Sequence, residues 1–408
     1  MSNADLFQLR RVKPGRSAAA SLPGIDRHLL LPVLLLATIG IVMVFSASYP
    51  MVLNSGKESI SDLLRLDVGK RGAYEFALKQ FIFALLGGGV LFAFSRLRQN
   101  VLRSSAYPAL LVAFVFLVLV LKIGREINGA HSWIQVGPIN FQPSEFAKVA
   151  LMLTLARLFA DRSRPPLTGR ELLLPLLIAG LVCGLVLLEK DFGTTAVIFS
   201  TILAMLFLAG ARIKHLLALA VSAGVVGAIF VYTEPYRLDR ILSFIDPVRY
   251  ADSGGYQIQR ALIAIGSGGP FGLGFSHSRE KFFYLPTPHT DCIFAVTAEE
   301  LGLFFCLGIL ALFFWLGWRG LKIAASSRDR FAALATAGMT TLILIQAATN
   351  LLVIMGLMPP TGLPLPFISY GGSSLVFSMM AVGIIANFSR SLPESSLPTP
   401  QTARPARS

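Results

Sequence analysis

Charge and cysteine are both scarce in this sequence. Charged residues make up 14% of the 408 residues, against about 25% in an ordinary soluble domain, so the chain is too poor in charge for a wholly water-facing surface. Its three cysteines exclude a secreted disulfide scaffold, and its 54% of hydrophobic residues excludes a mainly disordered chain. The five histidines form no i, i+4 pair, and the chain has no phosphate-binding or dinucleotide-binding glycine motif. These absences argue against a histidine metal motif and against ATP hydrolysis.

Long apolar runs are what the sequence has in abundance. A run of about 18 or more apolar residues is long enough to cross the hydrocarbon core of a membrane. Such runs lie at 29–47, 76–95, 106–123, 144–161, 172–189, 193–210, 216–233, 292–317, 332–355 and 374–391. We therefore predict an all-α integral membrane protein of about ten transmembrane helices, with residues 29–391 forming one membrane domain. The remaining residues are too few for a separate soluble enzyme domain.

The net charge of +14 is distributed as a topology signal. With the N-terminus inside, the inner segments 1–28, 96–105, 162–171, 211–215, 318–331 and 390–408 hold more than half of the 36 Lys and Arg. The positive-inside rule then predicts that both termini are cytoplasmic. Residues 1–28 become a cytoplasmic leader, and 392–408, rich in Ser, Pro and Thr, a disordered cytoplasmic tail. The basic residues are expected to meet membrane lipids, and we expect no nucleic-acid partner.

Three outer segments stand apart, at 124–143, 234–291 and 356–373. The middle one is the only large extracytoplasmic loop and joins the seventh and eighth spans. Its apolar stretches, such as 256–265, predict that it folds against the membrane surface. The last one includes TGLPLPFISYGGSS, whose Pro and Gly residues forbid a regular helix. Irregular backbone near membrane depth is tolerated where protein or water covers it, which favours a cavity-lining segment over a simple tight loop.

Ionisable residues at the edges of spans are candidates for chemistry. Asp291 lies where the long loop enters the eighth span, as a helix cap or as a general base whose pKa is raised by partial burial. Thr290 is the other candidate cap. Glu299 and Glu300 lie about two turns deeper, and either pair with a buried lysine or serve the reaction.

Two further charged pairs have open alternatives. Glu145 and Lys148 are spaced i, i+3 and share a helix face, either as a self-neutralised pair or with Lys148 meeting an anionic group such as a diphosphate. Lys190 and Asp191 in the hairpin EKDFGT are either functional or merely solvated. The amides after Gly371 and Gly372 could cradle a phosphate.

Taken together, these segments resemble the SEDS family of bacterial cell-wall polymerases over residues 29–391. The resemblance rests on GIVMVFSAS at 40–48, GREINGAHSWIQVGPINFQPSEFAK at 124–148, DFGT at 191–194, GYQIQ at 255–259, HTDCIFAVTAEELG at 289–302 and LPLPFISYGGSS at 363–374. These motifs are most similar to those of the division members of the family, and an elongation-type member is the alternative. Two departures stand out: Ser132 where the family often has Arg, and Glu189-Lys190-Asp191 where it often has Gln-Pro-Asp.

The resemblance implies a peptidoglycan glycosyltransferase of the bacterial inner membrane, working at the division septum. It implies lipid II and the nascent glycan strand as substrates, and a class B penicillin-binding protein and other divisome membrane proteins as partners. It also implies that Asp291 is the essential carboxylate, as base or as ligand of a Mg²⁺ or Mn²⁺ ion. Candidate substrate-binding residues are Arg125, Trp133, Gln142, Ser144, Glu145, Lys148, Tyr256, Gln257, His289, Thr290, Ser369, Tyr370, Gly371, Gly372 and Ser373. The rival hypotheses are a lipid II flippase and a non-catalytic divisome scaffold.

Overall fold

Helices make up most of the structure, a computed structural model that describes residues 25–53, 73–127, 130–137, 139–162, 167, 169–232, 235–250, 254–282 and 284–390. In chain order the helices are α1 (Arg27–Leu53), α3 (Ala73–Arg96), α4 (Gln99–Ile123), α5 (Pro143–Arg162), α6 (Gly169–Leu188), α7 (Phe192–Ala209), α8 (Ile213–Tyr232), α9 (Pro235–Ile245), α10 (Gly254–Gly268), α11 (Ile293–Ser326), α12 (Arg330–Ile354) and α13 (Gly372–Ser389). The predicted tail 392–408, and the predicted leader up to residue 24, lie outside the described residues.

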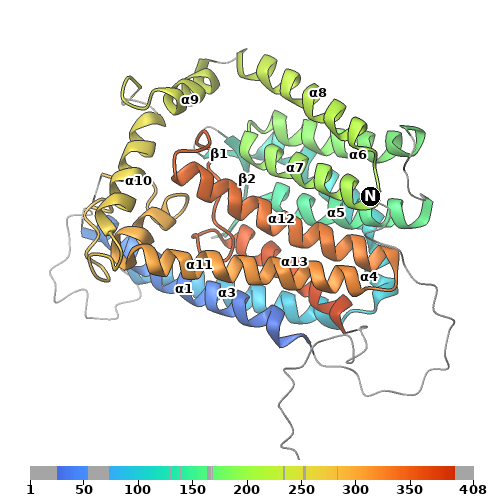
Figure 1. Cartoon of the computed structure of the whole chain (residues 1–408), viewed down its shortest axis with the longest axis horizontal. Coiled ribbons are helices and arrows are strands. Elements are labelled where there is room, and N and C mark those ends of the chain that lie inside the picture. The colour runs from blue at the N-terminus through green and yellow to red at the C-terminus, as the bar shows by residue number, and fades with distance from the viewer. Residues whose placement is uncertain are drawn as a thin grey trace, which may run out of the picture.

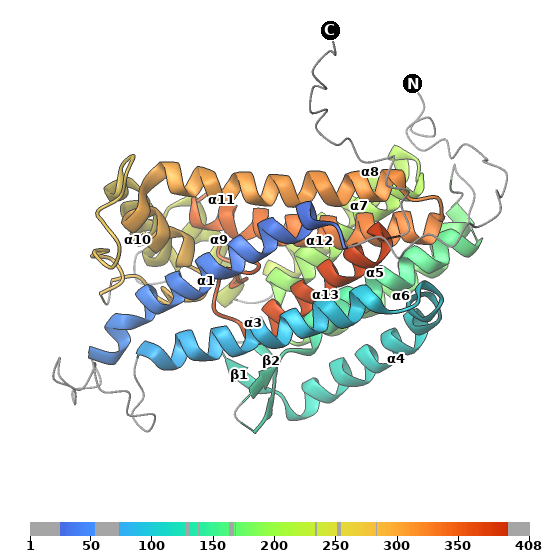
Figure 2. The same ribbon diagram turned by 90° about the horizontal axis from the view of Figure 1, so that it is seen from below.

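The long helices run side by side as a bundle (Figures 1 and 2). α9, α10 and the loop that follows them gather at one end, on the left in both figures. At this end α4, α6 and α12 finish and α5, α7, α11 and α13 begin, and we call it the Asp291 end. The opposite end carries the start of α1, where Asp26 pairs with Arg319 of α11 at 2.6 Å.

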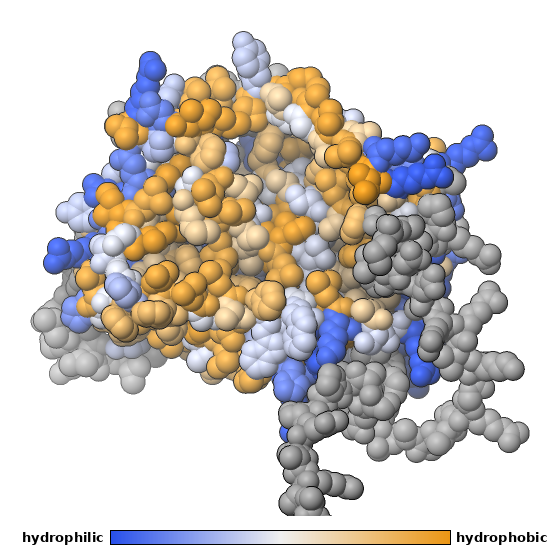
Figure 3. All heavy atoms as spheres, in the orientation of Figure 1, coloured by the Kyte–Doolittle hydropathy of each residue, from blue (hydrophilic) through white to orange (hydrophobic). Residues whose placement is uncertain are grey.

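The surface of the bundle suits a membrane. Hydrophobic residues cover most of the face in Figure 3, whereas strongly hydrophilic residues gather toward its left and right ends. Among the described residues, nine helices are long and apolar enough to cross a membrane: α1, α3, α4, α6, α7, α8, α11, α12 and α13. They coincide with nine of the ten predicted spans, so the prediction of a multi-pass, all-α membrane protein is confirmed.

The tenth predicted span, 144–161, forms the 20-residue helix α5 but is less apolar than the others. It carries Glu145, Lys148, Arg157 and Asp161. α5 packs against α4, α6, α7, α12 and α13, so protein surrounds it on several sides. A helix enclosed in this way needs no continuous apolar surface, because its polar groups find partners inside the protein.

Two outer segments are more ordered than the sequence indicates. Residues 125–141 form a small antiparallel sheet of three strands, β1 (Arg125–Ile127), β2 (Ala130–Val136) and β3 (Ile139–Phe141), in the order β1-β2-β3. The predicted long loop contains α9 and α10, with α10 packed on α11 and α9 packed on α8 and α10. The strands and α9 are short, which is why hydrophobic length alone does not reveal them.

α11 is interrupted at Gly302, which has φ 77° and ψ −178°, whereas the sequence predicts one continuous span here. The loop 269–274 fills the interruption. Its amides at Leu273 and Gly274 donate to the carbonyls of Glu299 and Glu300, and its carbonyls at Gly269 and Pro270 accept from Leu303 and Phe304, at 2.9–3.2 Å. Peptide groups freed from a helix within a membrane must be satisfied by protein, and this loop satisfies them.

We expect Gly302→Ala to destabilise the protein by about 2 kcal/mol or more, because φ is positive and an added Cβ would lie 2.3 Å from the amide nitrogen of Gly272. Gly308→Ala, in the same helix, is the matched control, since its Cβ would meet nothing within 4 Å. Thermal unfolding in detergent measures both. Equal unfolding temperatures for the two variants would contradict the argument.

Candidate functional site

Asp291 lies just before α11, at the end of the bundle where α9 and α10 gather. The N-cap of α11 is Cys292, which makes no side-chain capping bond, so neither Asp291 nor Thr290 is the cap. The Asp291 carbonyl accepts a hydrogen bond from the side-chain amide of Asn350 on α12 at 3.0 Å. The side-chain oxygen Oδ2 of Asp291 lies 3.8 Å from the position that a Cβ added to Gly362 would occupy. The half-buried carboxylate therefore faces the irregular segment 355–371, which joins α12 to α13.

Partial burial makes Asp291 a stronger base than an ordinary aspartate. Burial raises its pKa from 3.8 to about 6, and the positive charge of Arg240 opposes part of that rise. A carboxyl with this pKa is mostly ionised at neutral pH and still accepts a proton more readily than a solvated one. This is the behaviour that general-base catalysis needs.

The predicted irregular backbone is found over residues 355–371, whereas residues 372–374 of the predicted stretch 361–374 already belong to α13. Side chains hold segment 355–371 in place. Asn350 donates to the carbonyl of Leu363 at 2.7 Å, and Gln346 donates to the carbonyl of Pro364 at 3.2 Å. Gln80 of α3 donates to the carbonyl of Ser369 at 3.1 Å. The segment then leads into α13, whose N-cap is Gly371 and whose first turn holds Gly372 and Ser373. Its backbone is thus fixed beside Asp291 by amides from two helices.

Lys148 supports this segment from within the bundle. Its Nζ lies 2.8 Å from Oε1 of Glu145 and 2.6 Å from Oε1 of Gln346, and the Lys148 side chain is only 2% exposed. The structure forms the Glu145–Lys148 pair, the first of the two alternatives, and a role of either residue in substrate binding stays a prediction. In this arrangement the ammonium group of Lys148 bonds to Glu145 and Gln346. Gln346 in turn donates to the carbonyl of Pro364, so Lys148 helps to position segment 355–371.

In the hairpin at 189–194, Asp191 is bonded into the same site, whereas Lys190 is exposed. Asp191 caps α7 by accepting from the amide of Thr194 at 2.9 Å, and it also accepts from Nε2 of Gln142 at 3.1 Å. The backbone N–H of Gln142 donates to Oγ of Ser373 at 3.1 Å. A Cβ on Gly193 would stand 2.5 Å from the carbonyl of Thr361, so the hairpin lies directly against segment 355–371.

Glu189, the first residue of this hairpin, is fully buried, and neither of its carboxyl oxygens has a hydrogen-bond partner among the described residues. Burial, together with the negative charge of Asp191, raises its pKa from 4.5 to about 9. Glu189 is therefore a neutral carboxylic acid at physiological pH. A neutral acid can donate one hydrogen bond and accept another, as the amide of glutamine can.

His289 belongs to a group of three aromatic rings that includes Tyr370 of segment 355–371. Its ring centroid lies 5.1 Å from that of Phe76 and 5.6 Å from that of Tyr370, and the last two are 5.3 Å apart. Burial lowers the pKa of His289 to about 4, so the imidazole is neutral. The amide of Tyr370 donates to the His289 carbonyl at 2.9 Å, which joins the loop before α11 to segment 355–371.

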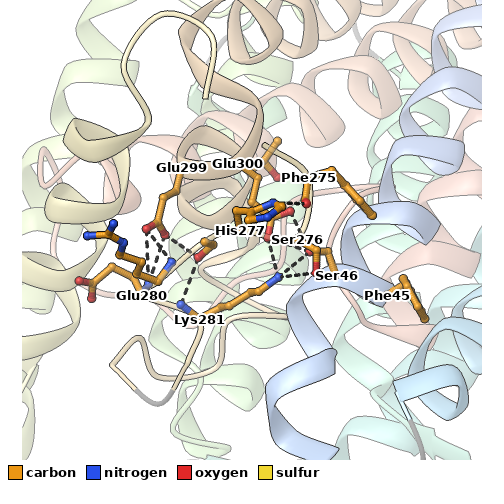
Figure 4. A network of polar contacts seen from close by, with 12 residues as sticks. Phe45, Ser46, Phe275, Ser276, His277, Glu280, Lys281, Glu299 and Glu300 are labelled. Carbon is orange, nitrogen blue, oxygen red and sulfur yellow. Dashed lines mark hydrogen bonds and ion pairs between the residues drawn. The ribbon is translucent and has the colours of Figure 1, made fainter. Parts of the chain in front are cut away.

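Glu299 and Glu300 serve structure (Figure 4). Glu300 accepts from Nζ of Lys281 at 2.7 Å and from Oγ of Ser46 at 2.7 Å, so of the two alternatives the structure shows the pairing with a buried lysine. Glu299 accepts from Oγ of Ser278 and from the amide of Arg279. Together the two carboxylates fasten the loop before Asp291 to α11 and α1.

The other predicted site residues lie on α10, on the strands β1 and β2, in the loop before α11 and on α5. Gln257 of α10 donates to Sγ of Cys292 at 3.3 Å, and Tyr256 stacks on Arg260 at 5.1 Å. Trp133, half-buried on β2, lies opposite the exposed Arg125 on β1. Thr290 donates to the carbonyl of Thr287, and Ser144 is buried on α5.

Several contributors to the site are not among the predicted residues: Phe76, Gln80, Arg240, Gln346 and Asn350. Gln346 and Asn350 are polar residues spaced i, i+4 in an otherwise apolar span, which is a detectable signal. Within the described residues, no group of three or more His, Cys, Asp or Glu could hold a metal ion. Mg²⁺, however, is commonly held by one or two carboxylates together with substrate phosphates, and Asp291 suits that arrangement.

Comparison with known proteins matches this architecture. The family model described as "Cell cycle protein", covering FtsW, RodA and SpoVE, matches residues 27–394. The chain is 38% identical over 372 residues to Stage V sporulation protein E of Bacillus subtilis, covering 90% of this chain and 97% of that one. It is 37% identical over 370 residues to the probable peptidoglycan glycosyltransferase FtsW of Trichlorobacter lovleyi, covering 90% of this chain and 93% of that one.

Two solved structures share the fold. One is a chain solved in a study of structural coordination of polymerization and crosslinking by a peptidoglycan synthase complex. It has a TM-score of 0.72 and 31% identity over 91% of this chain and 99% of that chain. The other is the rod shape determining protein RodA of Thermus thermophilus, with a TM-score of 0.64 and 29% identity over 90% of this chain and 97% of that one.

We expect Glu189→Gln to stabilise the protein increasingly as the pH rises. A carboxyl whose pKa is raised from 4.5 to about 9 on folding binds its proton more tightly in the folded state, so its contribution to stability is lost between those pH values. Glutamine has no proton to lose. Thermal unfolding from pH 5 to pH 9 should show a difference in favour of the variant that widens with pH. Parallel curves would mean that Glu189 is ionised, and Asp239→Asn, at an exposed position, is the control.

We expect Lys148→Met to lower the free energy of unfolding by about 3–5 kcal/mol, because it leaves Glu145 buried without a counter-charge. Adding Glu145→Gln should recover part of the loss. Lys79→Met is the matched control, since the Lys79–Glu75 pair is 43% and 37% exposed and should contribute about 1 kcal/mol at most. Chemical or thermal unfolding compares the variants. Similar losses for Lys148→Met and Lys79→Met would exclude the buried-pair explanation.

Proposed function

The chain belongs to the FtsW, RodA and SpoVE family of cell cycle proteins, and from this membership we propose that it polymerises lipid II into glycan strands. It is a multi-pass membrane protein and a peptidoglycan glycosyltransferase of this family. The observation that carries the assignment to this chain is the placement of Asp291. A half-buried carboxylate with a pKa of about 6 lies where α11, α12 and segment 355–371 meet.

The reaction needs a base for a sugar hydroxyl. The 4-hydroxyl of the acceptor GlcNAc attacks C1 of the donor MurNAc, forming the O4–C1 bond, while the bond between C1 and the phosphate oxygen breaks. Asp291 takes the hydroxyl proton, and undecaprenyl diphosphate leaves with the electron pair. C1 passes through an oxocarbenium-like state. A positioned base contributes about 10²–10⁴-fold to such a step.

Segment 355–371 and the first turn of α13 complete the site. Amides at Gly372 and Ser373 point from a helix N-terminus, which favours negative charge. Tyr370 and His289, with a neutral imidazole, form the wall that meets the sugars. In the alternative role, Asp291 holds a Mg²⁺ or Mn²⁺ ion, which would supply positive charge to the diphosphate.

The proposed orientation of the bundle in the membrane follows from the distribution of its basic residues. The end opposite Asp291 carries Arg96, Arg98, Arg103, Arg212, Arg319, Arg330 and Arg390. By the positive-inside rule this end is cytoplasmic, as are both termini and the tail 392–408, and Asp291 faces outward.

We place the protein in the bacterial inner membrane at the division septum, in keeping with its FtsW relatives. A class B penicillin-binding protein is the proposed partner, alongside other divisome membrane proteins, in keeping with the structural relative from a synthase complex.

Transport of lipid II is less well supported. A transporter would use intramembrane charges along a path, and Glu145, Lys148, Glu299 and Glu300 are the charges available. Each of them is buried and has a partner in the structure. The interruption of α11 at Gly302 is likewise filled by the chain's own loop. These groups stabilise the fold, which favours a site of fixed geometry over a translocation path.

We expect Asp291→Asn to lower lipid II polymerisation at least about 10²-fold without lowering the unfolding temperature, because the variant removes a carboxylate whose burial is unfavourable at neutral pH. The wild-type kcat/KM should fall as the pH decreases through about 6, because protonation removes the base. Gel analysis of glycan strands made with the class B partner measures both effects, and Asp239→Asn should behave as wild type. Strands of equal yield from Asp291→Asn would move the base elsewhere. A folded wild-type complex that makes none would return attention to lipid II translocation.

A further inference from the structure

Three arginines meet at the end of the bundle opposite Asp291, where α3 turns into α4 beside the end of α13. The guanidinium of Arg390, which follows α13, donates through Nη1 to the carbonyl of Ser95 at 2.9 Å. Arg96 is the next residue along α3, and Arg98 is the N-cap of α4 and makes no side-chain capping bond. We call Arg96, Arg98 and Arg390, gathered around this one turn, the arginine corner.

The backbone of the arginine corner is held by α13. A Cβ on Gly383 of α13 would lie 2.6 Å from the carbonyl oxygen of Leu91 on α3, so the two helices are in close contact here. Nδ2 of Asn387 then donates to the carbonyls of Phe94 and Leu97, at 2.8 and 2.7 Å. The meeting of the three arginines is therefore a fixed feature of the fold, although the residues come from opposite ends of the sequence.

The described carboxylates at this end of the bundle interact with other cations. The pairs are Asp26 with Arg319, Asp161 with Arg103 and Arg157, Asp329 with Arg103, and Glu171 with Arg330. Within the described residues, none of the three arginines of the corner forms an ion pair. Like charges that the fold brings together repel one another, and a bound anion would relieve that repulsion.

The arginine corner lies at the edge of the apolar surface. The guanidinium of Arg96 stacks over the ring of Phe92, one turn earlier in α3, at 5.0 Å. Phe92 is 56% exposed on a helix that is long and apolar enough to cross a membrane, and Leu97 in the turn is also exposed. A cation stacked on an exposed aromatic ring suits the depth of lipid headgroups, where apolar side chains meet acyl chains and charges meet phosphates. This depth favours a ligand with a negative head and apolar tails.

We propose that the arginine corner binds the headgroup of an anionic phospholipid. The phosphate accepts from the exposed guanidinium groups of Arg96 and Arg98, and an acyl chain lies against Phe92 on the outer face of α3. A guanidinium suits this task because its planar fork of N–H donors can hold two phosphate oxygens at once. Basic pockets between transmembrane helices bind such headgroups. The bound lipid joins α3, α4 and α13 and removes the repulsion among the three arginines.

The test measures the binding of fluorescent phosphatidylglycerol to the full-length protein in a zwitterionic detergent. Arg96→Gln/Arg98→Gln should weaken binding about 10-fold or more, and Arg96→Lys/Arg98→Lys, which keeps the charge, should weaken it less. Arg212→Gln/Lys214→Gln is the matched control, since both residues are exposed at the same end and the charge change is the same. This control should bind as wild type. Phosphatidylglycerol should also raise the unfolding temperature of wild type and of the control, but not that of Arg96→Gln/Arg98→Gln.

Four outcomes would overturn the proposal. Wild-type affinity in Arg96→Gln/Arg98→Gln would exclude the site, and an equal loss in the control would mean diffuse attraction to every basic residue at this end. Competition by inorganic phosphate at the lipid's own concentration would assign the corner to a soluble phosphate group. Binding of polyglutamate but not of phosphatidylglycerol would make it a docking site for an acidic protein. Should the double glutamine variant unfold, Arg98→Gln alone carries the comparison, and wild-type affinity in it would exclude the site.

Discussion

Water does not reach the apolar middle of a membrane, so every peptide group that leaves a helix there must find its partner within the protein. The chain meets this constraint twice near its site. Side-chain amides of Gln346 and Asn350 hold the carbonyls of segment 355–371, and the loop before α11 fills the interruption at Gly302. Asp291 lies between these two arrangements, bonded to Asn350 through its own carbonyl. The position of Asp291, the proposed catalytic base, therefore depends on the hydrogen bonds that satisfy the irregular backbone around it.

Hydrophobic length predicts the helices because a membrane span is a property of one continuous segment. The same local reasoning finds Asp291, since a carboxylate at the edge of a span is unfavourable unless it has a use. Contacts between distant segments have no local signature. Nothing in the run around Gly302 indicates that the loop 269–274 inserts there, and the short strands at 125–141 are below the length that periodicity can resolve. Arg240 is missed for the same reason, because only the fold brings α9 onto Pro360.

Glu189 shows how burial can change the meaning of a substitution. Where related proteins often have Gln-Pro-Asp, this chain has Glu189-Lys190-Asp191, which adds one carboxyl group next to Asp191. A charged glutamate there would repel Asp191. The fully buried position instead keeps the proton on Glu189, and the neutral acid offers one donor and one acceptor, much as glutamine does. The departure from the family pattern is thus smaller in chemistry than in sequence.

The enclosed helix α5 also has a consequence for how the protein is made. Helices enter a membrane during synthesis largely according to their own hydropathy, and α5 is the one long helix of the described bundle that is not apolar enough to be recognised as a span by itself. Glu145 and Lys148 are unfavourable in lipid until α12 supplies Gln346, which is made almost 200 residues later. Biogenesis therefore requires α5 to be retained beside its neighbours, or by an insertion factor, until the second half of the chain arrives. Glu145 and Lys148, which help to hold segment 355–371 through Gln346, are thus the same residues that make α5 depend on assistance during insertion.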